Sequence, residues 1–321
     1  MNGGQVKVGF ERDPDGEELL RFVRSSPIAT FFHSPAWLEV LEESFPDFEC
    51  GWLVARRDEE LAGLMPVSRI RRRPFFYLHS MPFGTYGHPL AVGEGTGDAL
   101  MDAFFDEASA FRCLEAEANL FYGRIPGDIP RGWKVRSEEC SVISIEEGFE
   151  EYRSRGMSRK RRQLCNRCER EGVEARLLSP ERDLDEFYSV YLQSASRWGG
   201  LHPYPRRFFE SLFSKREQGV LVWGAFVKGR LEASHVDFYF GNTAQAWQAA
   251  VSKGAYDLDL AAFLIMNAVR EGIGRGVRLF NLGSSGGDRG MIFFKESMGG
   301  RPVEYPVVEK RGSLLRWIRR R

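Results

Sequence analysis

A glycine-rich loop followed by a lysine is the part of the sequence best suited to chemistry. It lies within residues 277–307, which read VRLFNLGSSGGDRGMIFFKESMGGRPVEYPV. The glycines between residues 283 and 290 permit positive φ angles and let backbone amides approach a bound group closely. Four polar side chains accompany them: Ser284, Ser285, Asp288 and Arg289. We therefore predict a substrate-binding loop that follows a strand.

Lys295 follows two large aromatic residues, Phe293 and Phe294. An ammonium group held against apolar neighbours can be partly desolvated, and it could then stabilise an oxyanion or a phosphate. The alternative is a lysine whose stem covers apolar surface while its charge stays in water. If the site transfers an acyl group to an amine, a base must also accept a proton. Asp237 and Asp288 are the candidates for that base.

The distribution of charge indicates an anionic partner for the second half of the chain. The 321 residues are enough for two domains, and their formal net charge is zero. Residues 1–150 hold 15 Lys and Arg against 26 Asp and Glu, whereas residues 151–321 hold 30 against 19. The basic half could therefore bind a phosphate ester, a nucleic acid or a membrane surface, although the opposite charges could also help the halves to dock.

The composition also bears on location and on metal binding. The first twenty residues lack the apolar core of a signal peptide, and no apolar run approaches the roughly 20 residues of a membrane helix, so we expect a cytoplasmic protein. Five scattered cysteines fit reduced thiols. Cys165 and Cys168 have neither a second cysteine pair nor a nearby histidine, so we predict packing on a helical face and no metal site.

The periodicity of apolar residues predicts an α+β protein with a repeated order of elements. In the first half we expect helices over 16–25, 36–44 and 98–112, and strands over 52–56, 61–70, 114–120 and 133–145. In the second half we expect a basic helix over 153–170, helices over 184–196, 206–215 and 260–271, strands over 220–227, 232–240 and 244–251, and further strands after 277. This is the element order of a GNAT acyltransferase domain, and the first half looks like a reduced copy.

Two loops rich in glycine and proline offer further substrate contacts. The first, residues 80–90, carries Tyr86 and His88, and the second, residues 197–205, carries Arg197, His202 and Tyr204. Loops of this composition have a defined shape and often carry binding residues. The alternative is that these side chains only pack the loops against neighbouring helices.

The basic helix is a candidate contact for the donor substrate. Its charged residues include Arg159, Lys160 and Arg162, with Ser158 as a plausible cap. Such a helix could hold phosphates, including those of a tRNA acceptor stem, through charge rather than base recognition. A solvated charged face is the alternative, since no aromatic residues are interleaved as in sequence-specific RNA binders.

Four blocks of the sequence resemble the FemABX-like transferases, particularly the FemAB-related proteins of exopolysaccharide and exosortase systems. They are FHSPAW at 32–37, SMPFGTYG at 80–87, the basic helix running into EREGV at 169–173, and FNLGSS at 280–285 with FK at 294–295 and MGGRP at 298–302. The resemblance implies two tandem GNAT-like domains, each with a mixed, mostly antiparallel sheet flanked by helices. We place them at residues 1–148 and 149–310, followed by a basic tail at 311–321.

The resemblance also implies an activity. Characterised members transfer amino acids from aminoacyl-tRNA to an amine on peptidoglycan precursors, and the lysine of their Phe-Lys motif is thought to stabilise the tetrahedral intermediate. Lys295 would inherit that role. The chain departs from the common FDFGRS motif, because FNLGSS lacks its acid and its base; Arg289 could supply the positive charge. The long helical arm of the staphylococcal enzymes is also absent.

The segment before the helix at 260–271 bears on the donor. A CoA-dependent GNAT domain cradles pyrophosphate there with a glycine-containing loop and the helix N-terminus. This chain has KGAYDLD at 253–259, in which Asp257 and Asp259 would repel a pyrophosphate and Lys253 alone offsets them. We therefore favour aminoacyl-tRNA over acyl-CoA as the donor, with Lys253 and Tyr256 as contacts and no bound cofactor.

Together these features predict an acyl or aminoacyl transferase that acts on an amine of a cell-envelope or exopolysaccharide precursor by direct transfer. Two alternatives remain open: an acyl-CoA-dependent N-acetyltransferase, and a non-catalytic module that binds a polysaccharide or a lipid-linked precursor on the same scaffold. The tail RGSLLRWIRRR at 311–321 could be a short amphipathic helix on anionic lipid at the inner face of the membrane, or a frayed charged terminus.

Overall fold

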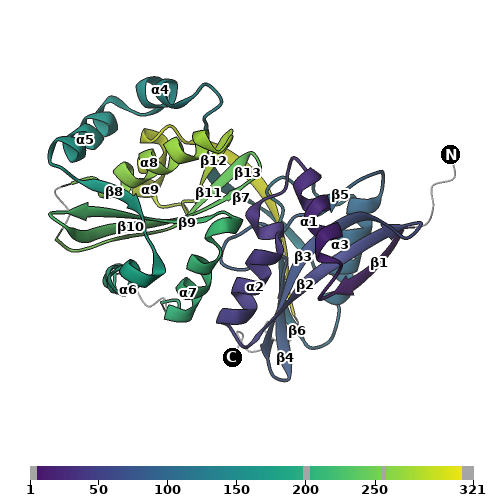
Figure 1. Ribbon diagram of the computed structural model, residues 1–321. Coiled ribbons are helices and arrows are strands. Elements are labelled where there is room, and N and C mark those ends of the chain that lie inside the picture. The colour runs from purple at the N-terminus through teal and green to yellow at the C-terminus, as the bar shows by residue number, and fades with distance from the viewer. Residues whose placement is uncertain (1–5, 198–202, 255–257, 313–321) are drawn as a thin grey trace. The chain divides into compact units, whose positions relative to one another are not determined.

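A computed structural model describes residues 6–197, 203–254 and 258–312. The chain divides into two compact units. The first unit holds the described residues up to Glu138 and those from Glu304 onward, and the second unit is Glu139–Val303. Each unit combines helices with a mostly antiparallel sheet, so the predicted α+β class is confirmed (Figure 1).

The sheet of the first unit has the strand order β1-β2-β3-β4-β6-β13. Neighbouring strands are antiparallel except β4 and β6, which are parallel. The elements of this unit are β1 (Val6–Glu11), α1 (Gly16–Ser25), η1 (Phe31–His33), α2 (Pro35–Ser44), β2 (Phe48–Arg57), β3 (Glu60–Arg72), β4 (Phe75–His79), β5 (Leu90–Ala91), α3 (Thr96–Glu107), β6 (Cys113–Asn119), the start of β7 (Lys134–Ser144) and the end of β13 (Arg301–Arg311).

The sheet of the second unit has the order β7-β12-β11-β10-β9-β8, and its one parallel pair is β11 with β12. Besides parts of β7 and β13, this unit contains α4 (Phe149–Glu151), a π-helical turn η2 (Tyr152–Gly156), α5 (Arg159–Arg170), β8 (Glu174–Leu177), α6 (Pro180–Ala195), α7 (Arg206–Ser214), η3 (Arg216–Gln218), β9 (Val220–Val227), β10 (Arg230–Phe240), β11 (Thr243–Val251), α8 (Leu260–Gly274), β12 (Leu279–Ser284) and α9 (Arg289–Ser297).

The two units repeat one arrangement. In each, a hairpin is followed by a third strand and then by a helix that leads to a parallel neighbour: β2-β3-β4-α3-β6 in the first unit and β9-β10-β11-α8-β12 in the second. A parallel pair requires such a crossover, because its second strand must start again at the same end of the sheet. The predicted tandem repeat is therefore present.

The final strand of each sheet comes from an unexpected part of the sequence. Residues 307–311 of β13, at the end of the described chain, pair with β6 of the first unit. Residues 140–144 of β7, which follow the first unit, pair with β12 of the second unit. The chain thus passes between the units at Glu138 and returns at Glu304.

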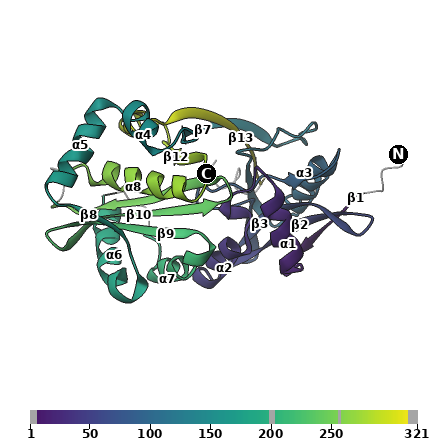
Figure 2. The ribbon, with the colours of Figure 1, turned by 45° about the horizontal axis from the view of Figure 1, so that its top comes forward.

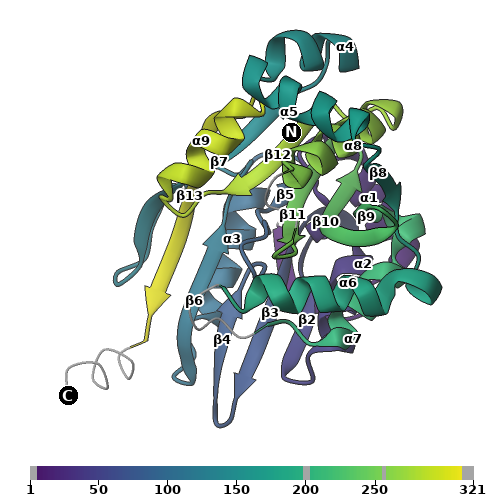
Figure 3. The ribbon, with the colours of Figure 1, turned by 90° about the vertical axis from the view of Figure 1, so that its left-hand side faces the viewer.

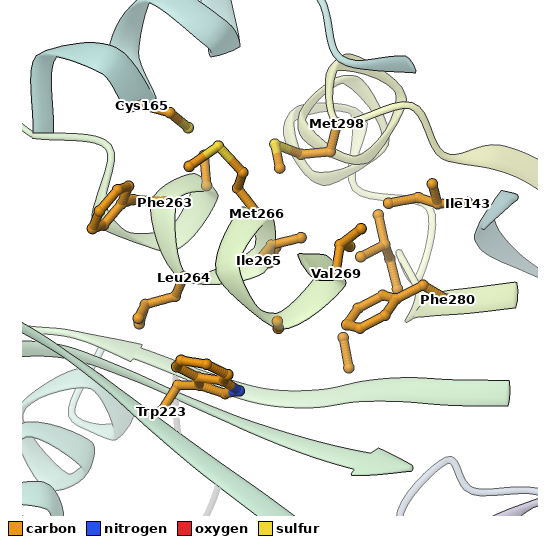
Figure 4. Packing of buried hydrophobic residues seen from close by; sticks show 14 of the residues in the cluster. Ile143, Cys165, Trp223, Phe263, Leu264, Ile265, Met266, Val269, Phe280 and Met298 are labelled. Atoms are coloured by element: carbon orange, nitrogen blue, oxygen red, sulfur yellow. The ribbon is translucent and has the colours of Figure 1, made fainter. Parts of the chain in front are cut away.

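Helix α8 is the centre of the second unit's core. It is apolar on nearly all sides, and it packs between the sheet on one side and α5 on the other, while α6 and α7 cover the opposite face of the sheet (Figure 2). Cys165 and Met298 lie on the outer side of α8, and Trp223 lies beneath it on the sheet (Figure 4). This packing fixes the start of α8 and the end of β12, where the candidate site lies.

The two cysteines of α5 belong to the same core, as their helical spacing predicts. Both are fully buried, and burial raises the pKa of the Cys165 thiol to about 12 and that of Cys168 to about 11. Both thiols therefore stay protonated near neutral pH. Among the residues that the structure describes, no group of three or more His, Cys, Asp or Glu could hold a metal ion.

Strands β1, β4 and β8 were not predicted, and two further differences bear on the candidate site. The basic segment is not one helix from residue 153, because a π-helical turn ends at Gly156 and α5 begins only at Arg159, capped by Ser158 as predicted. The glycine-rich loop is shorter than predicted, since helix α9 begins at Arg289 and carries the aromatic pair and Lys295 (Figure 3). Asp288 explains this start, because its carboxylate accepts a hydrogen bond from the amide of Met291 at 2.8 Å.

A substitution at Gly219 would test the packing at the start of β9. Its φ is +112°, and a Cβ atom there would lie 2.2 Å from the carbonyl oxygen of Tyr239, to whose amide Gly219 is also hydrogen-bonded. Gly229 has a φ of +78° but open space around the same position. We expect Gly229→Ala to lower the free energy of unfolding by about 1–2 kcal/mol through backbone strain alone. Gly219→Ala should cost roughly 3 kcal/mol or more, because the clash adds to the strain.

The measurement is urea unfolding of both variants, followed by circular dichroism. Equal losses of stability in the two variants would contradict the close approach of Gly219 to β10.

Candidate active site

Lys295 lies at the carboxyl end of β12. The residue belongs to α9, and its side chain is buried. Its Nζ atom donates hydrogen bonds to the carbonyl oxygens of Gly283 at 2.8 Å and Ser284 at 2.7 Å. Burial lowers the pKa of this ammonium group to about 8. An ammonium group has three N–H donors, so one remains that no described residue accepts. The group is charged near neutral pH and has a donor to offer to a substrate.

The loop before α9 is shaped by bonds from side chains to nearby amides. Asn281 accepts from the amide of Gly283 at 2.7 Å, and Ser284 accepts from the amide of Gly286 at 3.2 Å. Gly283 itself has a φ of +74°, which turns its carbonyl group and that of Ser284 toward Lys295. The strand end therefore presents two carbonyl groups to one ammonium group.

The predicted loop residues gather at this place. Ser284 contributes its carbonyl group to Lys295, Asp288 caps α9, and Arg289 is the first residue of that helix. Ser284, Asp288 and Arg289 are exposed, and Ser285 is partly exposed. The predicted substrate contacts of this loop therefore lie beside the Lys295 side chain, which bonds to the carbonyl oxygen of Ser284.

Asp237 is placed differently from Asp288. It lies on the central strand β10, has no exposed surface, and faces the core under α8. Its Oδ1 atom is 2.9 Å from Nδ1 of His235, which is also buried and which the sequence analysis did not single out. Burial raises the pKa of the Asp237 carboxyl group. A substrate amine cannot reach this carboxyl group directly in the described structure.

The basic residues of α5 divide into two groups. Arg159 and Lys160 are exposed in the first turn, which contains no acidic residue. Arg162 instead donates to three carbonyl oxygens, those of Arg153, Ser154 and Met157, and so holds the bend before the helix. The first pair is available to a bound anion, and Arg162 is engaged in the structure.

The start of α8 already holds a carboxylate. Asp259 accepts a hydrogen bond from the amide of Ala262 at 3.4 Å and forms an ion pair with Arg161, a residue that the sequence analysis did not single out. This is the helix end at which a CoA-dependent GNAT domain would bind pyrophosphate. The negative charge that the helix N-terminus favours is therefore supplied by the chain itself.

The second predicted substrate loop reaches the end of β11. Arg197 donates to the carbonyl oxygen of Val251 at 2.6 Å, and Lys253 is exposed two residues further along the chain. The ring of Tyr204 packs on Trp247, and burial raises the pKa of its hydroxyl group. His202 and Tyr256 lie outside the described residues. Since β11 and β12 are parallel, Arg197, Lys253 and Lys295 all lie at the carboxyl ends of this pair, where ligands commonly bind in α/β sheets.

In the first unit, Tyr86 and His88 are buried. Tyr86 stacks on Phe121 with a centroid distance of 4.5 Å, and His88 is bonded through Nε2 to the carbonyl oxygen of Ile28 at 2.9 Å. His33 in turn bonds to the carbonyl oxygen of His88, and burial lowers the pKa of His33 to about 4. Both candidates therefore shape the loop from inside the unit.

A cavity of about 490 Å³ opens in another part of the first unit. It lies between the loop that precedes α3 and the segment that follows β6, and it is lined by Ile28, Pro89, Ala91, Gly93, Glu94, Gly95, Gly97, Asp98, Met101, Tyr122, Gly123, Arg124 and Pro126. Apart from Ile28, its lining residues come from residues 89–101, which include β5 and the start of α3, and from the segment that follows β6.

Comparison with known proteins supports the fold described above. Residues 153–291 match the family model of the acetyltransferase (GNAT) domain. The second unit therefore contains a GNAT domain, and the protein is an acyltransferase. The fold resembles that of FemX, with a TM-score of 0.74 and 11% identity over 97% of this chain and 99% of that one. No curated protein matches the sequence significantly.

Two other solved structures share the fold of this acyltransferase. One is the C-terminal domain of a putative lysylphosphatidylglycerol synthetase from Agrobacterium fabrum, with a TM-score of 0.62 and 14% identity over 96% of each chain. The other is a tandem GNAT protein from the clavulanic acid biosynthesis pathway, with a TM-score of 0.59 and 13% identity over 96% of this chain and 99% of that one. The resemblance to FemABX-like transferases is thus confirmed for the fold. Within the described ranges, no helix is both long and apolar enough to cross a membrane.

The titration of Lys295 tests the site directly. Because burial disfavours the charged form, the ammonium group should lose its proton with a midpoint near pH 8. An NMR titration of lysine side-chain ¹⁵Nζ signals would show this, with Lys295→Met to assign the signal. A midpoint near the ordinary lysine value of about 10.4 would mean that the side chain is solvated rather than buried at the end of β12.

Proposed function

We propose that this acyltransferase moves an aminoacyl group from aminoacyl-tRNA to an amine of a cell-envelope or exopolysaccharide precursor. The observation that carries the proposal is the buried ammonium group of Lys295, held by two carbonyl groups at the end of β12, with one N–H that no residue in the described ranges accepts. A preorganised donor in a partly desolvated place is what a developing oxyanion requires.

The reaction proceeds without a covalent enzyme intermediate. The amine nitrogen attacks the carbonyl carbon of the donor ester, a C–N bond forms, and the carbonyl electron pair moves to oxygen, where Lys295 stabilises it. The intermediate then collapses, the ester C–O bond breaks, and the released hydroxyl group takes up the proton that the amine loses. Lys295 serves this step as a charged donor, since its pKa of about 8 keeps the ammonium form predominant near neutral pH.

Of the two candidate bases, Asp288 fits the proposal better. Its carboxylate is exposed on the substrate loop at the start of α9, whereas Asp237 is enclosed beside His235. Asp288 would accept the proton of the incoming amine and pass it to the leaving hydroxyl group. Ser284, Ser285 and Arg289 would line the same loop around the acceptor.

The charges of the second unit favour a nucleic-acid donor over CoA. Asp259 already occupies the N-terminus of α8, so a pyrophosphate there would meet a carboxylate. Arg159 and Lys160 project from α5 into solvent, where they could bind tRNA phosphates by charge. Lys253 and Arg197 would add positive charge at the end of β11. These contacts carry no base-specific recognition.

The acceptor and the place of action follow from the same proposal. FemX and the lysylphosphatidylglycerol synthetase domain share this fold, and the second is named for an enzyme that acts on a lipid. A lipid-linked acceptor would bring the enzyme to the inner face of the membrane, where the basic residues 311–321 could bind anionic lipid. Most of this tail lies outside the described residues.

The test compares donors on the purified protein. With an amine-bearing peptidoglycan or exopolysaccharide precursor as acceptor, we expect turnover with aminoacyl-tRNA and none with acetyl-CoA. Lys295→Ala should lower kcat by about 10²–10³, because an oxyanion donor is lost. Glu296→Gln is the matched control, since Glu296 is the exposed neighbour on α9, and it should keep full activity.

Turnover with acetyl-CoA alone would show that the donor is wrongly assigned and that the protein is an N-acetyltransferase. Undiminished turnover in Lys295→Ala would contradict the role of Lys295. If neither donor reacts while the acceptor still binds, the proposal of aminoacyl transfer fails.

A further inference from the structure

Arg161 connects the basic helix to the helix that carries Lys295. Its Nε atom donates to the hydroxyl oxygen of Ser297 at 2.7 Å, and its Nη1 atom forms an ion pair with Asp259. Its guanidinium carbon lies 4.7 Å from the ring centroid of Phe294. The side chain is 16% exposed, so these contacts are largely shielded from water. One planar group therefore contacts two residues of α9 and the cap of α8.

These contacts determine the rotation of α9 about its axis. Successive residues of an α-helix are 100° apart, so Phe294 and Ser297 lie on one face and Lys295 lies about 100° from Phe294. Holding Phe294 and Ser297 against Arg161 therefore sets the direction in which Lys295 leaves the helix. That direction is toward the carbonyl groups of Gly283 and Ser284.

The hydroxyl group of Ser297 is both a donor and an acceptor in this arrangement. It donates to the carbonyl oxygen of Phe294 at 2.6 Å while it accepts from Arg161. The backbone adds a second link, because the amide of Ser158, the cap of α5, donates to the carbonyl oxygen of Ser297 at 2.8 Å. The first turn of α5 is thus fixed to the last turn of α9 by both side chain and backbone.

The same turn of α5 presents Arg159 and Lys160 to solvent. Three consecutive residues therefore point in two directions: Arg159 and Lys160 face solvent, and Arg161 faces α8 and α9. We propose that Arg161 is a positioning residue, which holds α9 in the rotation that places the Lys295 ammonium group for transfer, from the same helical turn that receives the donor phosphates. This inference rests on the proposed function for its kinetic part.

If Arg161 only stabilised the fold, its loss would have different measurable effects. Losing Arg161 would leave Asp259, which is only 15% exposed, without its ion-pair partner, and the protein would become less stable. Stability alone does not change the titration of a lysine on another helix or separate kcat from KM. A rotation of α9 would change the Lys295 titration and would lower kcat without changing KM, because Lys295 would lose its carbonyl partners and move toward water.

The experiment uses Arg161→Lys, which keeps a positive charge near Asp259 but lacks the planar fork that reaches Asp259 and Ser297 together. Arg170→Lys, an exposed position at the end of α5, is the matched control. In Arg161→Lys we expect kcat to fall about tenfold to a hundredfold, with KM for aminoacyl-tRNA changed by less than about threefold. The NMR titration midpoint of Lys295 should rise above its wild-type value. Arg170→Lys should change neither quantity.

Ser297→Ala is the second variant, in case Arg161→Lys folds poorly. It leaves the ion pair with Asp259 in place and removes the hydroxyl group, and it should shift the Lys295 midpoint in the same direction. An unchanged midpoint in both folded variants would overturn the inference, as would an unchanged kcat in Arg161→Lys. The titration needs no substrate, so a failure of the proposed donor would show as absent wild-type turnover and would leave this arm of the test intact.

Discussion

The hydrogen bonds between the Lys295 ammonium group and the carbonyl groups of Gly283 and Ser284 are the interaction on which the site depends. Removing an ammonium group from water is costly unless acceptors replace the lost hydration. Backbone carbonyl groups can serve as these acceptors where the regular pairing of a strand is interrupted. The end of β12 is such a place, because its register with β7 shifts between Asn281 and Ser284 and Gly283 turns the chain there with a positive φ.

The repeat shows what the fold supplies and what the side chains add. Both units place the carboxyl ends of one parallel pair beside a crossover helix. In the second unit these ends are surrounded by charged groups, including Lys295 and the ion pair of Arg161 with Asp259. In the first unit the loop from 80 to 90 is packed instead around His33 and His88, which burial keeps neutral because it lowers the pKa of both. The duplicated architecture thus carries two different chemical environments.

Much of the fold could be predicted from local patterns. The crossover helix, the meander of β9 to β11 and the cap at Ser158 each have a short-range signal, and the tandem repeat followed from their order. Lys295 could be singled out because it follows two aromatic residues within a glycine-rich region. The return of β13 to the first unit could not be predicted, because strand pairing over about 190 residues leaves no local trace.

The side-chain contacts of the site could not be predicted from the sequence either. Arg161 looked like its neighbours in a basic run, yet it faces inward while Arg159 faces solvent, and only the packing of α5 on α8 and α9 distinguishes them. Asp237 resembled a candidate base until its depth and its neighbour His235 were known. Helix α9 was missed because its start depends on one capping bond from Asp288 amid glycines that favour a turn.

The central claim is that Lys295 acts in its charged form, and the pH dependence of kcat tests it most directly. As pH rises through about 8, the ammonium form is lost, so kcat for aminoacyl transfer should fall with a midpoint near that value. In Lys295→Arg the charge persists at all accessible pH values, so the remaining activity should show no decline near pH 8. The same decline in Lys295→Arg, or no decline in the wild type, would contradict the account.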